Sequence, residues 1–400
     1  MGSMGLLSTV GLRWRIMDAM YELMIRLLIA SGLLALFIWN PYPLQYLELK
    51  SYDTLIMSTE PVQNENILIV DLDEDLIKAY EGYPLPRSLY AELIRKTNAV
   101  PGITVLMPDP DIRGKENDLT LSNAMMEVPT VLASAASTQS SKESLHVGTA
   151  QLGGDPLPWL YEYPGILRTE STLELSRKGL GLITATPEID GVTRRIPLVV
   201  NVQSKLYPAF GLELLRLAVN DPSYQLKTTQ EGISWIRVPS YPLMNTDANA
   251  RIFLDWNTNF YKQTGLEFLT NPIDAPFVIF GVTAEGVVNP TPTPAGVKYP
   301  HEIQANILHN LINGSAPSTP SWAPAGELFA LALGLLLVAL TVSSIYISAP
   351  VIFSLIGGSM FGALSLINIS EPTRQRLISY AVYCLKKKKG GGGGGGGGGG

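Results

Sequence analysis

Cysteine is almost absent from this sequence, which contains one, Cys384, in 400 residues. A single cysteine excludes an intramolecular disulfide and any metal site built from several cysteines. Cys384 lies in an apolar run, where the charged thiolate is disfavoured, so we do not expect it to act as a nucleophile. The lack of disulfides leaves the compartment open, because a large domain can be stable without them.

Charged residues are also scarce, at 16% of the chain, whereas hydrophobic residues make up 46%. Ordinary soluble domains carry roughly 25% charged residues. So apolar a composition excludes an intrinsically disordered chain and argues against a wholly soluble one. Acidic residues outnumber basic ones by 35 to 29, so we expect no nucleic-acid partner.

Both ends of the chain carry residues that we exclude from the fold. Residues 1–3 precede Met4 and resemble a cloning remnant. Residues 390–400 are all glycine, which no fold requires, and we interpret them as an artificial or unassigned tail.

The longest uncharged segment covers residues 328–370. As one helix it would be roughly twice as long as the ~30 Å hydrocarbon core of a bilayer. It therefore predicts two transmembrane helices, over residues 328–347 and 350–369. Small residues that would allow close helix packing in lipid are Gly357, Gly358 and Gly362. Residues 374–389 are interpreted as a truncated third C-terminal helix.

The N-terminal segment predicts one further transmembrane helix, over residues 16–39. Residues 27–39 carry no charge, and Asp18, Glu22 and Arg26 align on one helix face. No small-residue cleavage site follows Trp39, so we favour an anchor over a cleaved signal peptide. Arginines before this helix place residues 1–15 in the cytoplasm by the positive-inside rule, so that residues 41–326 are exported.

The exported segment alternates apolar runs with helical patterns, which predicts an α/β fold. We expect a mostly parallel mixed sheet with helices on both faces, in a single domain. The Asp190-Gly191 pair predicts a hairpin between residues 181–186 and 192–202, and residues 138–177 are expected to be irregular loops. Other strands are expected at 67–70, 103–107, 130–133, 251–256 and 277–281, and helices at 88–97, 117–126, 208–219 and 301–312.

Several motifs occur in an order that resembles a known family. Residues 65–74 read ENILIVDLDE, residues 82–87 read GYPLPR, and residues 181–195 read GLITATPEIDGVTRR. Residues 278–283 (VIFGVT), 292–294 (PTP) and the helix at 300–311 complete the series. Together they resemble the second type of CHASE domain, an extracellular sensory module of bacterial adenylate or guanylate cyclases and kinases. The resemblance covers about residues 41–322 and extends to the flanking transmembrane helices.

Polar residues directly follow several predicted strands, and ligands of open α/β sheets bind beyond the carboxyl ends of the strands. These residues could bind a divalent cation or a cationic ligand. Alternatively they cap helices and pair with the arginine that starts the next helix, which is the interpretation we favour. The candidate ligand-binding residues are Asp71, Asp73, Arg87, Asp109 and Thr283, with Asp111 and Glu285 nearby.

Other reactive groups give no catalytic pattern. His301 and His309 lie eight residues apart without a zinc-binding spacing. Arg194 and Arg195 are interpreted as a solvated pair or as members of internal ion pairs rather than as an anion site. We expect no metal, no cofactor and no enzymatic activity in this chain.

The resemblance implies a sensory module anchored in the inner membrane of a bacterium. It would pass a signal from the exported domain to a cytoplasmic output domain that this chain lacks. By analogy we expect a homodimer or larger oligomer, the bilayer as a partner, and an unknown small-molecule or protein ligand. The alternative is a scaffold component of an envelope assembly that binds no ligand.

Overall fold

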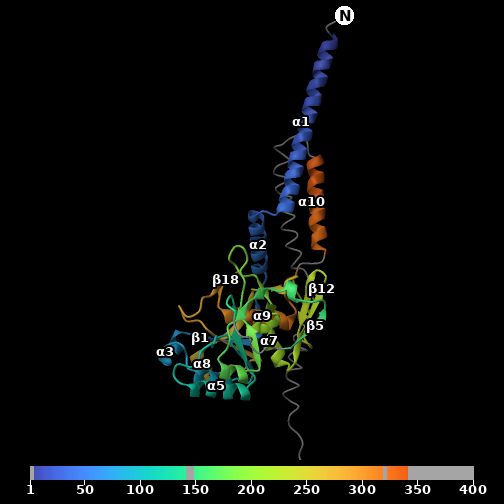
Figure 1. The fold of residues 1–400 in the computed structure, drawn as a ribbon. Coiled ribbons are helices and arrows are strands. Elements are labelled where there is room, and N and C mark those ends of the chain that lie inside the picture. Colours follow the sequence, from blue (N-terminus) through green and yellow to red (C-terminus); the bar gives the residue numbers. More distant parts are fainter. Residues whose placement is uncertain (1–3, 141–147, 319–321, 341–400) are drawn as a thin grey trace, which may run out of the picture. The chain divides into compact units, whose positions relative to one another are not determined.

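The computed structural model describes residues 4–140, 148–318 and 322–340. They belong to two compact units (Figure 1). The first is helical and contains α1 (Met4–Trp39), α2 (Tyr42–Met57) and α10 (Ala323–Leu340). The second, residues 59–318, contains the sheets and the remaining helices.

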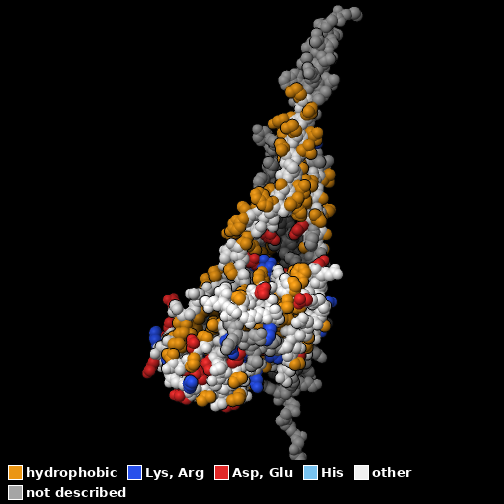
Figure 2. Space-filling model, in the orientation of Figure 1, with side chains coloured by type: hydrophobic (Ala, Val, Ile, Leu, Met, Phe, Trp, Pro, Cys, Tyr) orange, Lys and Arg blue, Asp and Glu red, His pale blue; other side chains and the backbone are white. Residues whose placement is uncertain are grey.

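Helix α1 ends at Trp39, as the sequence predicts, but begins upstream of the predicted start, at Met4. Its segment Met20–Trp39 is the one helix, among the described residues, that is long and apolar enough to cross a membrane. Helix α10 has a shorter apolar stretch, Ala325–Leu336, and packs against α1. Many hydrophobic side chains are exposed on the described parts of both helices (Figure 2).

Several predicted features lie outside the described residues. They are residues 341–347 of the predicted helix 328–347, the predicted helices at 350–369 and 374–389, the three glycines Gly357, Gly358 and Gly362, and Cys384.

The second unit is built on a six-stranded sheet in which every strand pair is parallel. Its central strands are almost entirely apolar, because a parallel sheet is covered on both faces. The strand order is β16-β1-β17-β2-β3-β8, so that β17, from late in the sequence, lies between β1 and β2. The bounds are β1 Val62–Leu72, β2 Val100–Ile103, β3 Val131–Ser134, β8 Gly179–Leu182, β16 Thr258–Thr264 and β17 Phe277–Val282.

Helices cover both faces of this sheet (Figure 1). One face packs on a large apolar core that includes Leu68, Leu93 and Phe280. The helices on that side are α3 (Glu74–Ala79), α4 (Arg87–Arg95), α5 (Lys115–Glu127), α6 (Ser171–Ser176) and α8 (Gly265–Thr270). The other face packs against α7 (Phe210–Ala218) and α9 (Pro300–Asn313). The predicted α/β class with a parallel sheet is confirmed.

The remaining strands form small sheets. Most of these sheets are pairs of strands, each two or three residues long. The longer strands β12 and β13 form an antiparallel hairpin flanked by β14 and β5. The bounds are β4 Ala136–Ser137, β5 Gly148–Gly153, β6 Glu162–Tyr163, β7 Gly165–Ile166, β9 Arg195–Pro197, β10 Val199–Val202, β11 Lys205–Pro208, β12 Ser223–Thr229, β13 Gly232–Arg237, β14 Met244–Asn245, β15 Arg251–Phe253, β18 Thr291–Thr293 and β19 Gly296–Lys298, with a 3-10 turn at Leu157–Trp159.

The hairpin predicted around Asp190-Gly191 is wrong. A turn is present, since the Glu188 N–H donates to the Val192 carbonyl at 2.9 Å, but the strands beside it do not pair. The buried strand β8 joins the parallel sheet and β9 pairs with β15. The strand expected at 103–107 is also displaced, to Val100–Ile103. The described part of the predicted loop region 138–177 contains three short strands (β5, β6 and β7), a 3-10 turn and α6.

Candidate functional site

The predicted ligand-binding residues lie along the carboxyl edge of the parallel sheet. Strands β1 and β17 pair in parallel with Asp71 opposite Gly281. The Thr283 N–H then donates to the Leu72 carbonyl at 3.2 Å, so Asp71, Asp73 and Thr283 come from adjacent chain segments. The sequence argument that strand ends meet at one edge is therefore correct for these three residues.

Asp73 caps a helix. Its side-chain Oδ1 accepts a hydrogen bond from the Leu76 N–H at 3.0 Å at the start of α3. The neighbouring Glu74 accepts from the Glu285 N–H at 2.8 Å, and backbone hydrogen bonds lower the pKa of the Glu74 carboxyl. The capping alternative therefore holds for Asp73.

Asp71 instead pairs with a histidine from the far end of the sequence. His301 Nε2 lies 2.8 Å from Asp71 Oδ1, and the His301 side chain is 1% exposed against 21% for that of Asp71. The imidazole stacks on the Tyr299 ring at 5.8 Å between centroids. A Cβ at Gly281 would lie 2.1 Å from the imidazole, so only glycine allows this approach. The pair ties the end of β1 to the first turn of α9.

An ion pair formed by Glu302 lies beside this contact on the same helix. Glu302 Oε1 accepts from Lys262 Nζ at 2.6 Å and lies 3.8 Å from Lys298 Nζ. Glu302 Oε2 also accepts from the Tyr299 N–H at 2.8 Å. Burial by itself raises the pKa of the Glu302 carboxyl, but the hydrogen bonds and the two lysines outweigh it and lower the pKa.

A pH titration tests this network. A lowered folded-state pKa contributes stability above the ordinary pKa of glutamate and loses it on acidification. We expect Glu302→Gln to be less stable than the wild type at pH 7, and the difference to shrink below about pH 4. Thermal unfolding across pH measures this. Glu92→Gln, in the exposed pair with Lys96, should change little at any pH. A constant Glu302→Gln deficit down to pH 3 would contradict the prediction.

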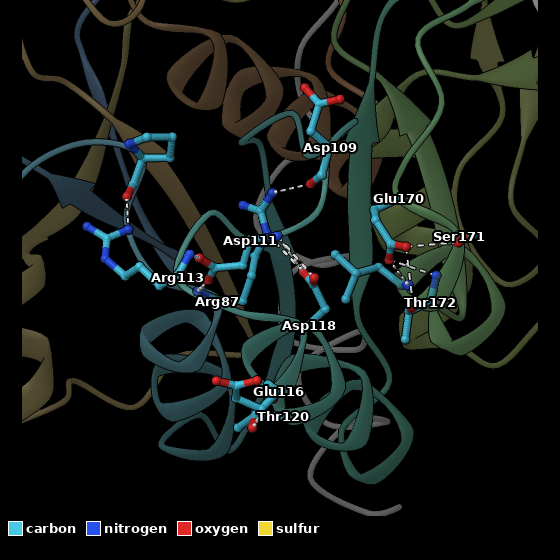
Figure 3. Close-up of polar contacts among 12 residues, drawn as sticks. Arg87, Asp109, Asp111, Arg113, Glu116, Asp118, Thr120, Glu170, Ser171 and Thr172 are labelled. Atoms are coloured by element: carbon cyan, nitrogen blue, oxygen red, sulfur yellow. Dashed lines mark hydrogen bonds and ion pairs between the residues drawn. The ribbon is translucent and has the colours of Figure 1, made fainter.

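Arg87 is the centre of a buried polar cluster at the start of α4 (Figure 3). Its backbone N–H donates to Asp111 Oδ2 at 2.7 Å and its Nη2 to the Asp109 carbonyl at 3.2 Å. Its Nε lies 3.7 Å from Asp118 Oδ1. Burial raises the pKa of the Asp118 carboxyl, although the Asp111 N–H and the charge of Arg87 act in the opposite direction.

The predicted pairing of Arg87 with acidic residues is present, but its partners differ from those expected. Asp109 contributes its backbone carbonyl, and its carboxylate points away from Arg87 and is exposed (Figure 3). The buried charge partner is Asp118, on α5, which sequence reasoning did not single out. The only available signal was its position on the first turn of a helix, and that does not distinguish it from other acidic residues there.

Next to this cluster, Arg113 connects the segment around Asp111 to the loop that precedes α4. The Arg113 guanidinium donates to the carbonyls of Tyr80, Gly82 and Pro84, and the Arg113 N–H donates to Asp111 Oδ1 at 2.8 Å. The segment around Asp111 therefore holds both the loop before α4 and the first N–H of α4.

The arginines of the 181–195 motif form internal ion pairs, which is one of the two alternatives to an anion site that the sequence left open. Arg194 is fully buried and donates to Asp190 through two nitrogens at 2.9 and 2.7 Å. Arg195 makes a second two-point pair with Glu188 at 2.6 and 2.7 Å. Both arginines therefore have structural partners.

The arrangement offers capping and pairing more than open ligand positions. Within the described ranges, no group of three or more His, Cys, Asp or Glu side chains is placed to hold a metal ion. Among the predicted ligand residues, those whose side chains remain at least partly exposed and are not used as caps are Asp71, Asp109 and Thr283.

A family model described as the CHASE2 domain matches residues 28–342, from within α1 through the α/β unit and α10. No curated protein matches the chain, and neither does any solved structure.

Proposed function

Because the chain belongs to the CHASE2 family of extracellular sensory domains, we propose that it is a membrane-anchored module that senses a signal outside the cytoplasm. The observation that carries the proposal is the extent of the family match. It spans the sheet-containing unit and includes residues 28–39 of the apolar segment of α1 that ends at Trp39. The family match therefore covers the sensory fold together with parts of its flanking helices.

The proposed orientation places the N-terminus in the cytoplasm. Arg13 and Arg15 precede the apolar segment, and positive charge favours the cytoplasmic side. Residues 59–318 then lie outside the inner membrane of a bacterium. The signal passes to a cytoplasmic output domain, and the module works as a homodimer or larger oligomer without enzymatic activity of its own.

The sensing surface that we propose is the carboxyl edge of the parallel sheet. Asp71 and Thr283 lie on neighbouring chain segments there and have partly exposed side chains. A cation or cationic metabolite would gain from the Asp71 carboxylate and would compete with His301 for it. Such competition would couple ligand binding to the start of α9.

A ligand screen tests the sensing role. Thermal-shift assays and calorimetry on the full chain with Mg²⁺, Ca²⁺ and small cationic metabolites should reveal a stabilising ligand. One present at 100 times its Kd should add about 2.7 kcal/mol to the free energy of unfolding. Asp71→Asn should abolish that gain, whereas Asp75→Asn, in an exposed pair with Lys78, should keep it. A gain that survives in Asp71→Asn would contradict this surface.

The scaffold function is the second candidate. It is favoured by the internal engagement of Asp73, Arg87 and Asp111, which leaves few free polar groups at the edge. The coding sequence that follows Leu385 in the natural gene separates the two. A cyclase or kinase domain there supports signalling, and its absence together with a silent ligand screen supports a scaffold.

A further inference from the structure

Helix α2 carries an exposed aromatic stripe at its N-terminal end. Tyr42, Tyr46 and Lys50 follow one another at intervals of four residues and so share one helix face. The two tyrosine rings lie 6.4 Å apart, and Lys50 Nζ lies 5.6 Å from the centre of the Tyr46 ring. Tyr42 is 56% exposed and Leu47, beside the stripe, 54%.

The stripe begins directly after the apolar segment of α1. Trp39, the last residue of that segment, is 79% exposed, and Asn40 makes the turn with a positive φ of 38°. Gln45 Nε2 donates to the Asn40 carbonyl at 2.7 Å, and the Leu44 N–H donates to the Pro41 carbonyl at 2.8 Å. These bonds fix the start of α2 close to the end of α1.

The chemistry of the stripe suits the headgroup layer of a bilayer. Tyrosine and tryptophan concentrate there because their rings are apolar while their polar groups remain in contact with water and headgroups. The layer is roughly 5–8 Å thick on each side, and Tyr42 and Tyr46 are separated by about 6 Å of helix rise. Helical side chains lean toward the N-terminus, so the Lys50 amine is directed back toward the membrane end, as its position over Tyr46 shows.

We propose that the first two turns of α2 are a lipid-contacting anchor, with Tyr42, Tyr46 and Leu47 against the phospholipid headgroups and acyl carbonyls and Lys50 at the level of the phosphates. The proposal rests on the membrane anchoring by α1 proposed above. Contact with the bilayer at both α1 and α2 would set the depth of the span.

A second copy of the chain is the other occupant that such a face admits. A helix pair in water needs apolar residues repeated at heptad positions over several turns. Here the same face changes within three turns from an aromatic residue, Tyr42, to a charged one, Lys50. Lys50 Nζ also lies 3.4 Å from Asp53 Oδ2. The apolar part is therefore confined to the end that continues the membrane span, and this favours lipid.

Site-directed spin labelling of the full chain tests the anchor. In a Cys384→Ser background, single cysteines replace Leu36 in α1, Leu47 in α2, and the exposed Thr54 later in α2. Each variant is nitroxide-labelled and reconstituted in phosphatidylcholine–phosphatidylglycerol vesicles. Collision rates with oxygen, which concentrates in lipid, and with a water-soluble nickel chelate then report depth.

The proposal expects the label at position 36 to lie in the hydrocarbon and the label at position 47 to lie at the headgroups. Nickel access at position 47 should be several-fold lower than at position 54. Replacing both Tyr42 and Tyr46 by serine should shift the label at position 47 toward water. Equal nickel access at positions 47 and 54, with position 36 protected, would overturn the α2 anchor and leave α1 intact. Nickel access at position 36 as well would overturn both. Strong spin–spin broadening at position 47 without oxygen access would show a second copy on this face and overturn the lipid contact.

Discussion

Replacing Arg194 by alanine is expected to lower the free energy of unfolding by about 3–5 kcal/mol, because it leaves a buried charge without its partner. Arg194 is among the largest side chains that are fully buried in the described part of the chain, and the side chain of Asp190, its two-point partner, is only 3% exposed. Removal of the guanidinium leaves the Asp190 carboxylate without its two charge-assisted hydrogen bonds. Thermal or urea unfolding of the detergent-solubilised chain measures the loss.

Lys96→Ala is the matched control for this change. Lys96 and Glu92 form an ion pair with the same four-residue spacing, but their side chains are 36% and 52% exposed. An exposed pair contributes about 0–1 kcal/mol, so this variant should unfold nearly like the wild type. Similar losses of unfolding free energy in the two variants would show that burial of the ion pair does not determine how much stability its removal costs.

Gly181→Ala is also expected to destabilise the fold strongly. A Cβ at this position would lie 2.2 Å from the Phe210 Cα, an atom of the α7 backbone that no side-chain rotation can move. Overpacking a core usually costs about 1–3 kcal/mol, and a backbone clash should reach or exceed the upper end of that range. Loss of cooperative unfolding or of soluble expression is the expected observation.

Gly154→Ala provides the comparison. The nearest atom to its new Cβ is a Thr228 methyl group at 3.9 Å, which is ordinary contact, and the backbone there is not in the positive-φ region. This variant should retain wild-type stability. If Gly181→Ala were equally silent, α7 would not pack on β8 as closely as described.

The main sheet could be predicted because its strands are continuous apolar runs. Residues 67–70 and 277–281 have this character because they are buried on both faces. The β12–β13 hairpin was missed, since its strands carry polar residues such as Gln225 and Lys227 and read as loop. The false hairpin at Asp190-Gly191 had a correct turn signal, but a turn does not decide with which strands its flanks pair.

The site could be located from the sequence but its contacts could not. Chain order is enough to bring Asp71 and Thr283 to one edge, because parallel strands end together. The partner of Asp71 is His301, 230 residues away, and that pairing depends on how α9 packs over Gly281. Likewise Arg87 pairs with the carboxylate of Asp118 and not with that of Asp109. The direction of a loop side chain such as that of Asp109 is set by tertiary packing, which the sequence does not show.

Cysteine labelling in spheroplasts tests most directly whether the α/β unit lies outside a membrane anchored by α1. Gln230→Cys, in the exposed β12–β13 turn, and Ser8→Cys, before the apolar segment, are each made in a Cys384→Ser background and treated with a membrane-impermeant maleimide. The account predicts labelling at position 230 in intact spheroplasts and at position 8 only after lysis. Labelling at position 230 only after lysis would contradict it.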